Sequence, residues 1–155
     1  MSTTAETSPT ELSIRQATLD DADAVFALVN QLADRYDVDR AAFDDAFHHA
    51  VERAEDHLLQ VAVSADERVV GYVLMTIARL MYTRDDIAQI QELIVDESAR
   101  NQGVGSRLVY AMEDICRARN LSQLTVASNR APAFYDRLDY RSTADYLKKS
   151  FVFED

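Results

Sequence analysis

Glycine, proline, cysteine and tryptophan are scarce in this chain of 155 residues, which has three glycines, two prolines, one cysteine and no tryptophan. The single Cys116 excludes an internal disulfide and is typical of a reducing compartment. No apolar run approaches the roughly 20 residues that cross a bilayer. The first residues also lack the basic and apolar regions of a secretory signal. We therefore expect a cytoplasmic protein that does not associate with membranes.

Lysine is scarce too, whereas acidic residues are abundant. Only Lys148 and Lys149 are lysines among the 16 cationic residues, and the formal net charge is −11. This charge argues against nucleic acid as a partner, because phosphate binding requires a basic surface. The acidity either attracts a cationic amine substrate or forms the solvated surface of a protein from a salt-adapted organism. The acidic residues are scattered rather than clustered, which favours the second interpretation.

The length and the apolar content of 48% suit a single domain with a substantial core. The sequence contains no internal repeat and no low-complexity linker. The polar residues 1–10 are predicted to form a frayed tail. Residues 11–155 are predicted to form one domain.

Hydrophobic periodicity predicts a mixed α/β sheet flanked by helices. Strands are expected at 12–17, 58–63, 69–80, 88–95 and 121–127, with closing strands at 140–141 and 146–153. Helices are expected at 22–32, 40–53, 104–118 and 132–138. The strand at 88–95 becomes continuously apolar at Leu93, Ile94 and Val95, which predicts that its far end is covered on both faces.

Two of the three glycines, Gly103 and Gly105, lie together at the start of the third expected helix, in the stretch ARNQGVGSRLV. A helix start presents unpaired N–H groups and the positive end of the helix dipole. Without Cβ atoms, an anion such as a diphosphate can approach this backbone, and Arg100 adds positive charge. Ser106-Arg107 lacks the Lys-Ser/Thr pair of a Walker loop, and the spacing is not that of a dinucleotide fingerprint. The alternative is a tight turn without a ligand.

A wider pattern resembles the GNAT superfamily of N-acetyltransferases. Its first part is Arg100-x-x-Gly103-x-Gly105 after the strand that ends in Leu93-Ile94-Val95-Asp96. Its second part is the stretch SNRAPAFYDRLDY, residues 128–140. The order of elements is also similar from Leu12 onward. The resemblance implies a mixed, mostly antiparallel sheet with a V-shaped splay, helices on both faces, and transfer of an acetyl group from acetyl-CoA directly to a primary amine.

The resemblance also assigns the binding of acetyl-CoA. Backbone N–H groups around the glycines would hold the diphosphate, and the splayed strand would pair with the pantetheine arm. The N–H of Ile94 would polarise the thioester carbonyl, and Asn129 would bind from the opposite strand end. The cofactor-binding residues predicted in this way are Leu93, Ile94, Val95, Arg100, Asn101, Gln102, Gly103, Val104, Gly105, Ser106, Asn129 and Tyr135.

Two residues are candidates for proton transfer. Glu92 is the only carboxylate between Ala88 and Val95, and it is nominated as the general base, directly or through water. In a regular strand Glu92 shares a face with Ile90 and Ile94, while some GNAT members place the carboxylate where Gln89 or Gln91 stands, so a substrate-orienting role stays open. The resemblance places the phenol of Tyr135 at the sulfur, where it would protonate the departing thiolate.

Other features of the sequence say less about its function. The GNAT pattern usually has glycine where Asp139 stands, and aspartate tolerates the left-handed backbone expected there. The histidines lack partners at ligand spacing, so no metal is predicted. The acceptor amine, the acyl preference and a homodimer all stay open. The alternative to an enzyme is a CoA-binding regulatory module that has lost catalysis.

Overall fold

A five-stranded sheet with the strand order β1-β2-β3-β4-β5 runs through the computed structural model, which describes residues 11–32, 37–128 and 132–152. The first four strands are antiparallel, and β5 is parallel to β4. The strands are β1 (Ser13–Gln16), β2 (His57–Val63), β3 (Val69–Ala78), β4 (Ile87–Val95) and β5 (Leu124–Val126). Strand β5 is therefore shorter than the sequence predicts, whereas the other four agree closely.

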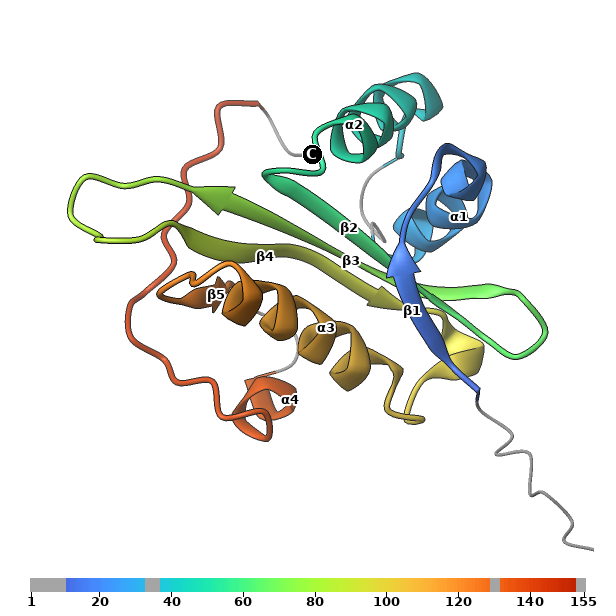
Figure 1. The fold of residues 1–155 in the computed structure, drawn as a ribbon. Coiled ribbons are helices and arrows are strands. Elements are labelled where there is room, and N and C mark those ends of the chain that lie inside the picture. The colour runs from blue at the N-terminus through green and yellow to red at the C-terminus, as the bar shows by residue number, and fades with distance from the viewer. Residues whose placement is uncertain (1–10, 33–36, 129–131, 153–155) are drawn as a thin grey trace, which may run out of the picture.

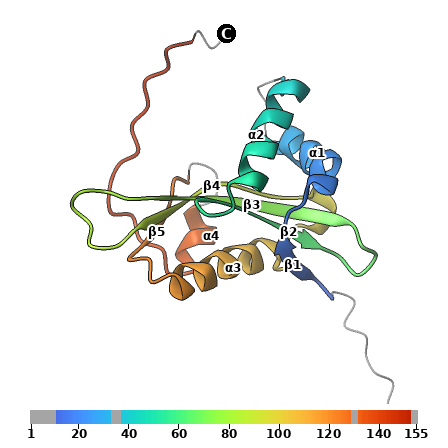
Figure 2. The same ribbon diagram turned by 45° about the horizontal axis from the view of Figure 1, so that its top comes forward.

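Helices cover both faces of the sheet, as Figures 1 and 2 show. Helices α1 (Ala22–Leu32) and α2 (Arg40–Glu52) lie on one face, and α3 (Val104–Ala118) and α4 (Pro132–Asp136) lie on the other. Short 3-10 helices at Leu19–Asp21 and Glu97–Ala99 precede α1 and α3. The mixed, mostly antiparallel sheet with helices on both faces confirms the fold class predicted from the sequence.

Two apolar clusters form the core, one on each face of the sheet. The cluster under α3 contains Leu108, Met112 and Met75, all fully buried. The cluster under α1 and α2 contains Tyr72, Val61 and Phe47. The far end of β4 contributes to both, with Leu93 and Val95 packed toward α3 and Ile94 packed toward α1. This arrangement confirms that the end of β4 is covered on both faces.

Strands β4 and β5 separate after a short common stretch. Their pairing joins Ala88 to Leu124, Gln89 to Thr125 and Ile90 to Val126. β5 ends at Val126 while β4 continues to Val95, so the second half of β4 has no strand partner on this edge within the described residues. The edge of β4 beyond Ile90 is therefore unpaired on the β5 side, as the V-shaped splay implied by the resemblance requires, and it leads into the loop before α3.

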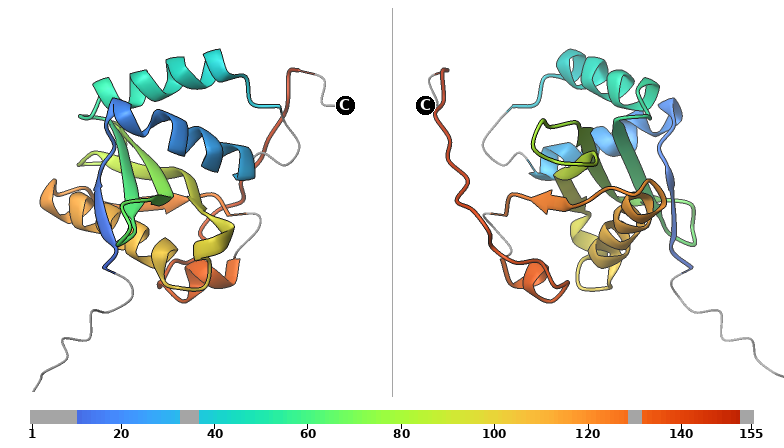
Figure 3. Two further views of the ribbon diagram at one scale, coloured as in Figure 1. Left: turned by 90° about the vertical axis from the view of Figure 1, so that its right-hand side faces the viewer. Right: turned by 60° about the vertical axis from the view of Figure 1, so that its left-hand side comes forward.

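The closing strands predicted at 140–141 and 146–153 are wrong for the described part of the chain. Residues 141–152 contain no strand; they run from α4 past the β5 end of the sheet toward the side of α1 and α2 (Figure 3). Large apolar side chains in this segment, Tyr146, Leu147, Phe151 and Val152, are exposed. Because these side chains are exposed, burial does not stabilise a sixth strand in the described part of the chain. The predicted tail at 1–10 lies outside the described residues, and a single domain at 11–155 stays a prediction.

Candidate functional site

The register between β3 and β4 shifts near the middle of β4. Leu74 faces Glu92, but the next residue, Met75, faces Ile90, so Gln91 is an extra residue on β4. Such a β-bulge reverses the alternation of side chains beyond it. Ile90 accordingly packs on the α3 side and Ile94 on the α1 side. The expectation that Ile90, Glu92 and Ile94 share one face is therefore wrong, because the sequence pattern does not reveal the bulge.

Glu92 lies beside the bulge and points to the α1 side of the sheet. The hydroxyl of the fully buried Tyr72 donates a hydrogen bond to Glu92 Oε1 at 3.2 Å. Burial raises the pKa of Glu92 above its ordinary value, although the hydrogen bond from Tyr72 lowers it in part. A half-buried carboxylate with a raised pKa is a stronger proton acceptor than an exposed one, as a general base requires. Sequence reasoning missed Tyr72, since a buried aromatic on a central strand looks like ordinary core.

The free edge of β4 presents the amides of Leu93 and Val95. The N–H of Asp96 donates to the carbonyl of Val70 on β3 at 2.8 Å. Because donors alternate along an antiparallel strand, the N–H of Ile94 also points to β3, and those of Leu93 and Val95 point into the splay. The prediction that the Ile94 N–H meets a thioester in the splay is therefore corrected: that group faces the ladder, and the neighbouring amides face the gap.

The loop between β4 and α3 is tied to α1 and to the β2–β3 hairpin. Asp96 accepts from Gln31 Nε2 at 3.0 Å, and Gln31 Oε1 accepts from the N–H of Glu97 at 3.3 Å. Asp96 also accepts from Ser98 at 2.6 Å and pairs with Arg68 at 3.3 Å. These hydrogen bonds, with Ser98 the largest contributor, lower the pKa of Asp96. Sequence reasoning missed Gln31, which lies 65 residues before its partner.

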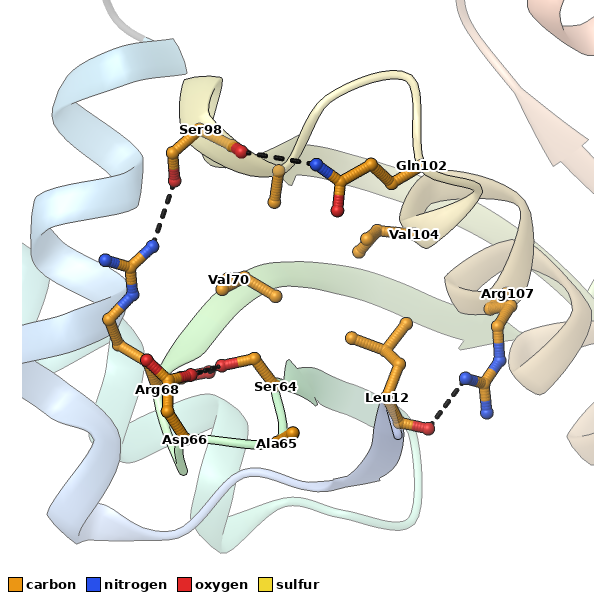
Figure 4. A pocket seen from close by; sticks show the side chains of 11 residues that line it. Leu12, Ser64, Ala65, Asp66, Arg68, Val70, Ser98, Gln102, Val104 and Arg107 are labelled. Atoms are coloured by element: carbon orange, nitrogen blue, oxygen red, sulfur yellow. Dashed lines mark hydrogen bonds between the residues drawn. The ribbon is translucent and has the colours of Figure 1, made fainter. Parts of the chain in front are cut away.

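A small cavity of about 190 Å³ lies between this loop, the hairpin and the start of α3 (Figure 4). Its wall includes Val70 and Val104, and its rim carries two arginines. Arg68 donates to Ser98 Oγ at 2.9 Å, and Arg107 donates to the carbonyl of Leu12 at 2.6 Å. Since both guanidinium groups bind protein atoms, the cavity marks where the loop is fastened to β1 and the hairpin.

Glycine is required at positions 103 and 105 for different structural reasons. Gly103 is the N-cap of the helix with φ of 80°, and a Cβ there would have no atom within 4 Å. The position therefore needs glycine for its backbone, and the space beside it is open. A Cβ on Gly105 would lie 3.3 Å from the ring of Phe134 in α4. Gly105 thus admits close packing of α4, a role that the sequence did not indicate.

The open space at Gly103 is where the diphosphate is predicted to bind. The N–H groups of the first turn of α3 have no intrahelical acceptor, and the helix dipole favours an anion there. Arg100 Nε donates to the carbonyl of Val95 at 3.2 Å, so this side chain lies against the end of β4. Asn101 also adopts a positive φ of 62°, which turns the loop into the helix. The other predicted loop residues are the exposed Gln102, the buried Val104 and the half-buried Ser106.

Tyr135 in α4 lies on the opposite side of the sheet from Glu92. It packs against the α3-side cluster, and its ring contacts those of Phe134 and Tyr140 at centroid distances of 4.9 and 5.8 Å. Burial raises the pKa of Tyr135, which keeps the phenol protonated. Tyr135 also lines a cavity of about 970 Å³ that Gln89 and Val126 border, near the point where β4 and β5 separate. Glu92 does not border this cavity.

The remaining predictions concern Asn129, metal and membranes. Asn129 lies outside the described residues. Within residues 11–32, 37–128 and 132–152, no three His, Cys, Asp or Glu side chains are grouped so as to hold a metal ion. None of the helices described is both long and apolar enough to cross a membrane.

Comparison with known proteins gives consistent matches. The model of the Acetyltransferase (GNAT) family matches residues 23–140. An aminoalkylphosphonate N-acetyltransferase from Salmonella typhimurium is 29% identical over 134 residues, which cover 84% of this chain and 85% of that protein. The structure of a transcriptional regulator from Bacillus halodurans has a TM-score of 0.81 at 22% identity, covering 90% of this chain and 99% of that one. A glucosamine-6-phosphate N-acetyltransferase from Arabidopsis thaliana has a TM-score of 0.80 at 19% identity, with coverage of 91% and 99%.

Proposed function

Since the chain belongs to the GNAT acetyltransferase family and is an acetyl-CoA-dependent N-acetyltransferase, we propose which of its residues hold the cosubstrate and move the protons. The observation that carries the proposal is the edge of β4 beyond Ile90, which is unpaired on the β5 side within the described residues and leads through the loop to the N-terminus of α3. The same strand carries Glu92, a carboxylate with a raised pKa.

The loop and the first turn of α3 bind the diphosphate of acetyl-CoA. The backbone from Gln102 to Ser106 supplies the N–H donors, and the open space at Gly103 admits the phosphates. Arg100 adds a positive charge from the same loop. The pantetheine arm pairs with the free edge of β4, where the amides of Leu93 and Val95 are directed. One of these two amides, rather than that of Ile94, donates to the thioester carbonyl. Asn129 keeps its predicted role at the opposite strand end.

Glu92 accepts the proton that the acceptor must lose before it attacks. An alkyl ammonium has a pKa of about 10, so it is mostly protonated at neutral pH. The carboxylate faces the α1 side of the sheet, and Oε1 is engaged by Tyr72. The acceptor therefore approaches from the side of α1 and α2 and gives its proton to Glu92, directly or through water.

Tyr135 donates a proton to the departing thiolate. Its raised pKa keeps the hydroxyl protonated, and it lies near the point where β4 and β5 separate. Because Tyr135 and Glu92 lie on opposite faces of the sheet, acid and base act on the two sides of the splay. The donated proton thus goes to sulfur and the abstracted proton leaves nitrogen, which agrees with direct transfer and no covalent enzyme intermediate.

The acceptor is a primary amine, and the related enzymes are the guide to the rest of the acceptor molecule. The relative from Salmonella is named for aminoalkylphosphonates, and the acidic residues of this chain are scattered in the sequence, so its net charge of −11 does not select one class of amine. We place the reaction in the cytoplasm, in keeping with the lone buried thiol of Cys116. We also propose that two copies of the chain associate through the C-terminal segment, residues 141–152, which carries exposed apolar side chains beside the β5 edge.

The test is release of CoA thiol from acetyl-CoA with a panel of aminoalkylphosphonates, polyamines and amino acids. We expect wild type to turn over at least one amine. With that amine, Glu92→Gln should lower kcat about 100-fold, the range of general-base catalysis, and leave the Kd of acetyl-CoA unchanged. Tyr135→Phe should also lower kcat with little effect on this Kd. A protein that binds acetyl-CoA tightly and releases no CoA with any amine would support the regulatory module instead.

A further inference from the structure

We propose that Tyr72 is a positioning residue that fixes the carboxylate of Glu92 so that Oε2 is the atom that receives the proton of the amine. The inference rests on the proposed base role of Glu92. Its geometric basis is the hydrogen bond of 3.2 Å from the Tyr72 hydroxyl to Glu92 Oε1 across β3 and β4.

The phenol of Tyr72 is held rigidly. Tyr72 faces Ile94 in the register of β3 and β4, so Glu92, two residues before Ile94, is its diagonal neighbour on the same face. Only 1% of the Tyr72 residue is exposed, and its ring belongs to the core cluster under α1 and α2. Because rotamer changes in such a cluster are costly, the hydroxyl stays where Oε1 can accept from it.

The β-bulge at Gln91 is what makes this contact geometrically available. If Gln91 were instead a regular residue of the strand, Ile90, Gln91 and Glu92 would alternate, and Glu92 would share the α3 face with Ile90 rather than the Tyr72 face. Within the described residues, Tyr72 is the group that bonds Oε1, and none donates to Oε2. Oε2 is thus the oxygen left for an incoming ammonium or a relay water.

Strands β3 and β4 and helix α1, which contact one another around this pair, carry few other ionisable side chains. Strand β3 presents Tyr72, and β4 carries no other ionisable side chain between Ile87 and Val95. Helix α1 carries one charged residue, Asp23, which pairs with Arg40 at 2.7 Å. Tyr72 itself stays protonated, because burial and the neighbouring carboxylate raise its pKa. Tyr72 therefore acts as a permanent donor, and its bond favours the charged form of Glu92.

The test is Tyr72→Phe, which keeps the ring and removes the donor. The Glu92 carboxylate is followed directly by ¹³C NMR during a pH titration, and kcat/KM is measured over the same range. Removing the hydrogen bond should move the Glu92 titration and the acid limb of kcat/KM to higher pH. We expect kcat/KM at pH 7 to fall roughly tenfold, as for one hydrogen bond to a charged group, while the Kd of acetyl-CoA stays within about twofold.

The matched control is Tyr140→Phe. Tyr140 donates to Glu113 Oε2 at 2.8 Å on the other face of the sheet, so this variant also loses a tyrosine–glutamate hydrogen bond. It should leave the Glu92 titration and the acid limb in place. A Glu92 resonance that titrates at the same pH in wild type and Tyr72→Phe overturns the inference. Full activity of Glu92→Gln would instead refute the base role of Glu92. The NMR titration would still show whether the hydrogen bond from Tyr72 changes the pKa of Glu92.

Discussion

Asp139 stands where the GNAT pattern usually has glycine, and its backbone adopts a left-handed φ of 66°. The sequence predicted this conformation, and the structure confirms it. The turn closes α4 through bonds from the N–H of Asp139 to the carbonyl of Asp136 at 3.1 Å and from Tyr140 to Tyr135 at 3.0 Å. A side chain in this region costs about 1 kcal/mol relative to glycine, and least for aspartate and asparagine. Aspartate therefore preserves the turn at a small cost in stability.

Asp139→Gly should raise the free energy of unfolding by about 0.5 kcal/mol, because glycine adopts positive φ without strain. Asp139→Val should lower it by about 1 kcal/mol or more, since a β-branched residue is poorly tolerated there. Chemical denaturation measures both changes. The control is Asp136→Gly, the same replacement at a helical position, which should destabilise. Equal stability of the valine variant and wild type would mean that residue 139 does not require this backbone.

At the scale of elements, the sequence predicted most of the sheet and missed the features that depend on contacts between strands. Apolar alternation and short apolar runs located β1 to β4, and helical spacing of apolar residues located the helix after the glycines, because the buried positions follow the period of each element. The bulge at Gln91 leaves no mark in the sequence pattern, yet it determines which face Glu92 occupies and which amides face the splay. The closing strands failed for a related reason: the segment has strand-like residues, but it pairs with none of the residues that the structure describes.

The loop before α3 gives a prediction at this scale. Gln31→Ala removes the bridge from α1 to Asp96 and to the N–H of Glu97. The loop should then be less ordered before binding, and the Kd of acetyl-CoA should rise about threefold to tenfold, since ordering must occur on binding. Isothermal titration calorimetry measures this change. Asn30→Ala is the control, because among the described residues the neighbouring Asn30 hydrogen-bonds within α1, to the carbonyl of Phe26. The expectation fails if both variants bind acetyl-CoA as wild type does.

At the scale of the whole molecule, the C-terminal segment is the feature that one chain does not account for. Tyr146, Leu147, Phe151 and Val152 are between 75% and 92% exposed. Side chains of this size are normally buried or part of an interface.

Removal of residues 146–155 should therefore shift the chain toward the monomer. Light scattering after size exclusion should give the mass of two chains for wild type and of one chain for the truncated form, at concentrations near 50 μM. The double variant Tyr146→Ser/Phe151→Ser provides the same test without shortening the chain. A wild type that is monomeric at all concentrations would contradict the proposed association, and the acetyltransferase assignment would stand.

Binding of the diphosphate at the start of α3 is the central step of the proposed function, and Gly103→Asn tests it directly. Asparagine tolerates the left-handed backbone at this position, and its Cβ meets no atom within 4 Å, so the fold should be retained. Its side chain would occupy the space assigned to the phosphates. Calorimetric titration should show a Kd for acetyl-CoA at least tenfold higher, about 1.4 kcal/mol, beside an unchanged unfolding transition. A correctly folded Gly103→Asn variant that binds acetyl-CoA with wild-type affinity would contradict the account.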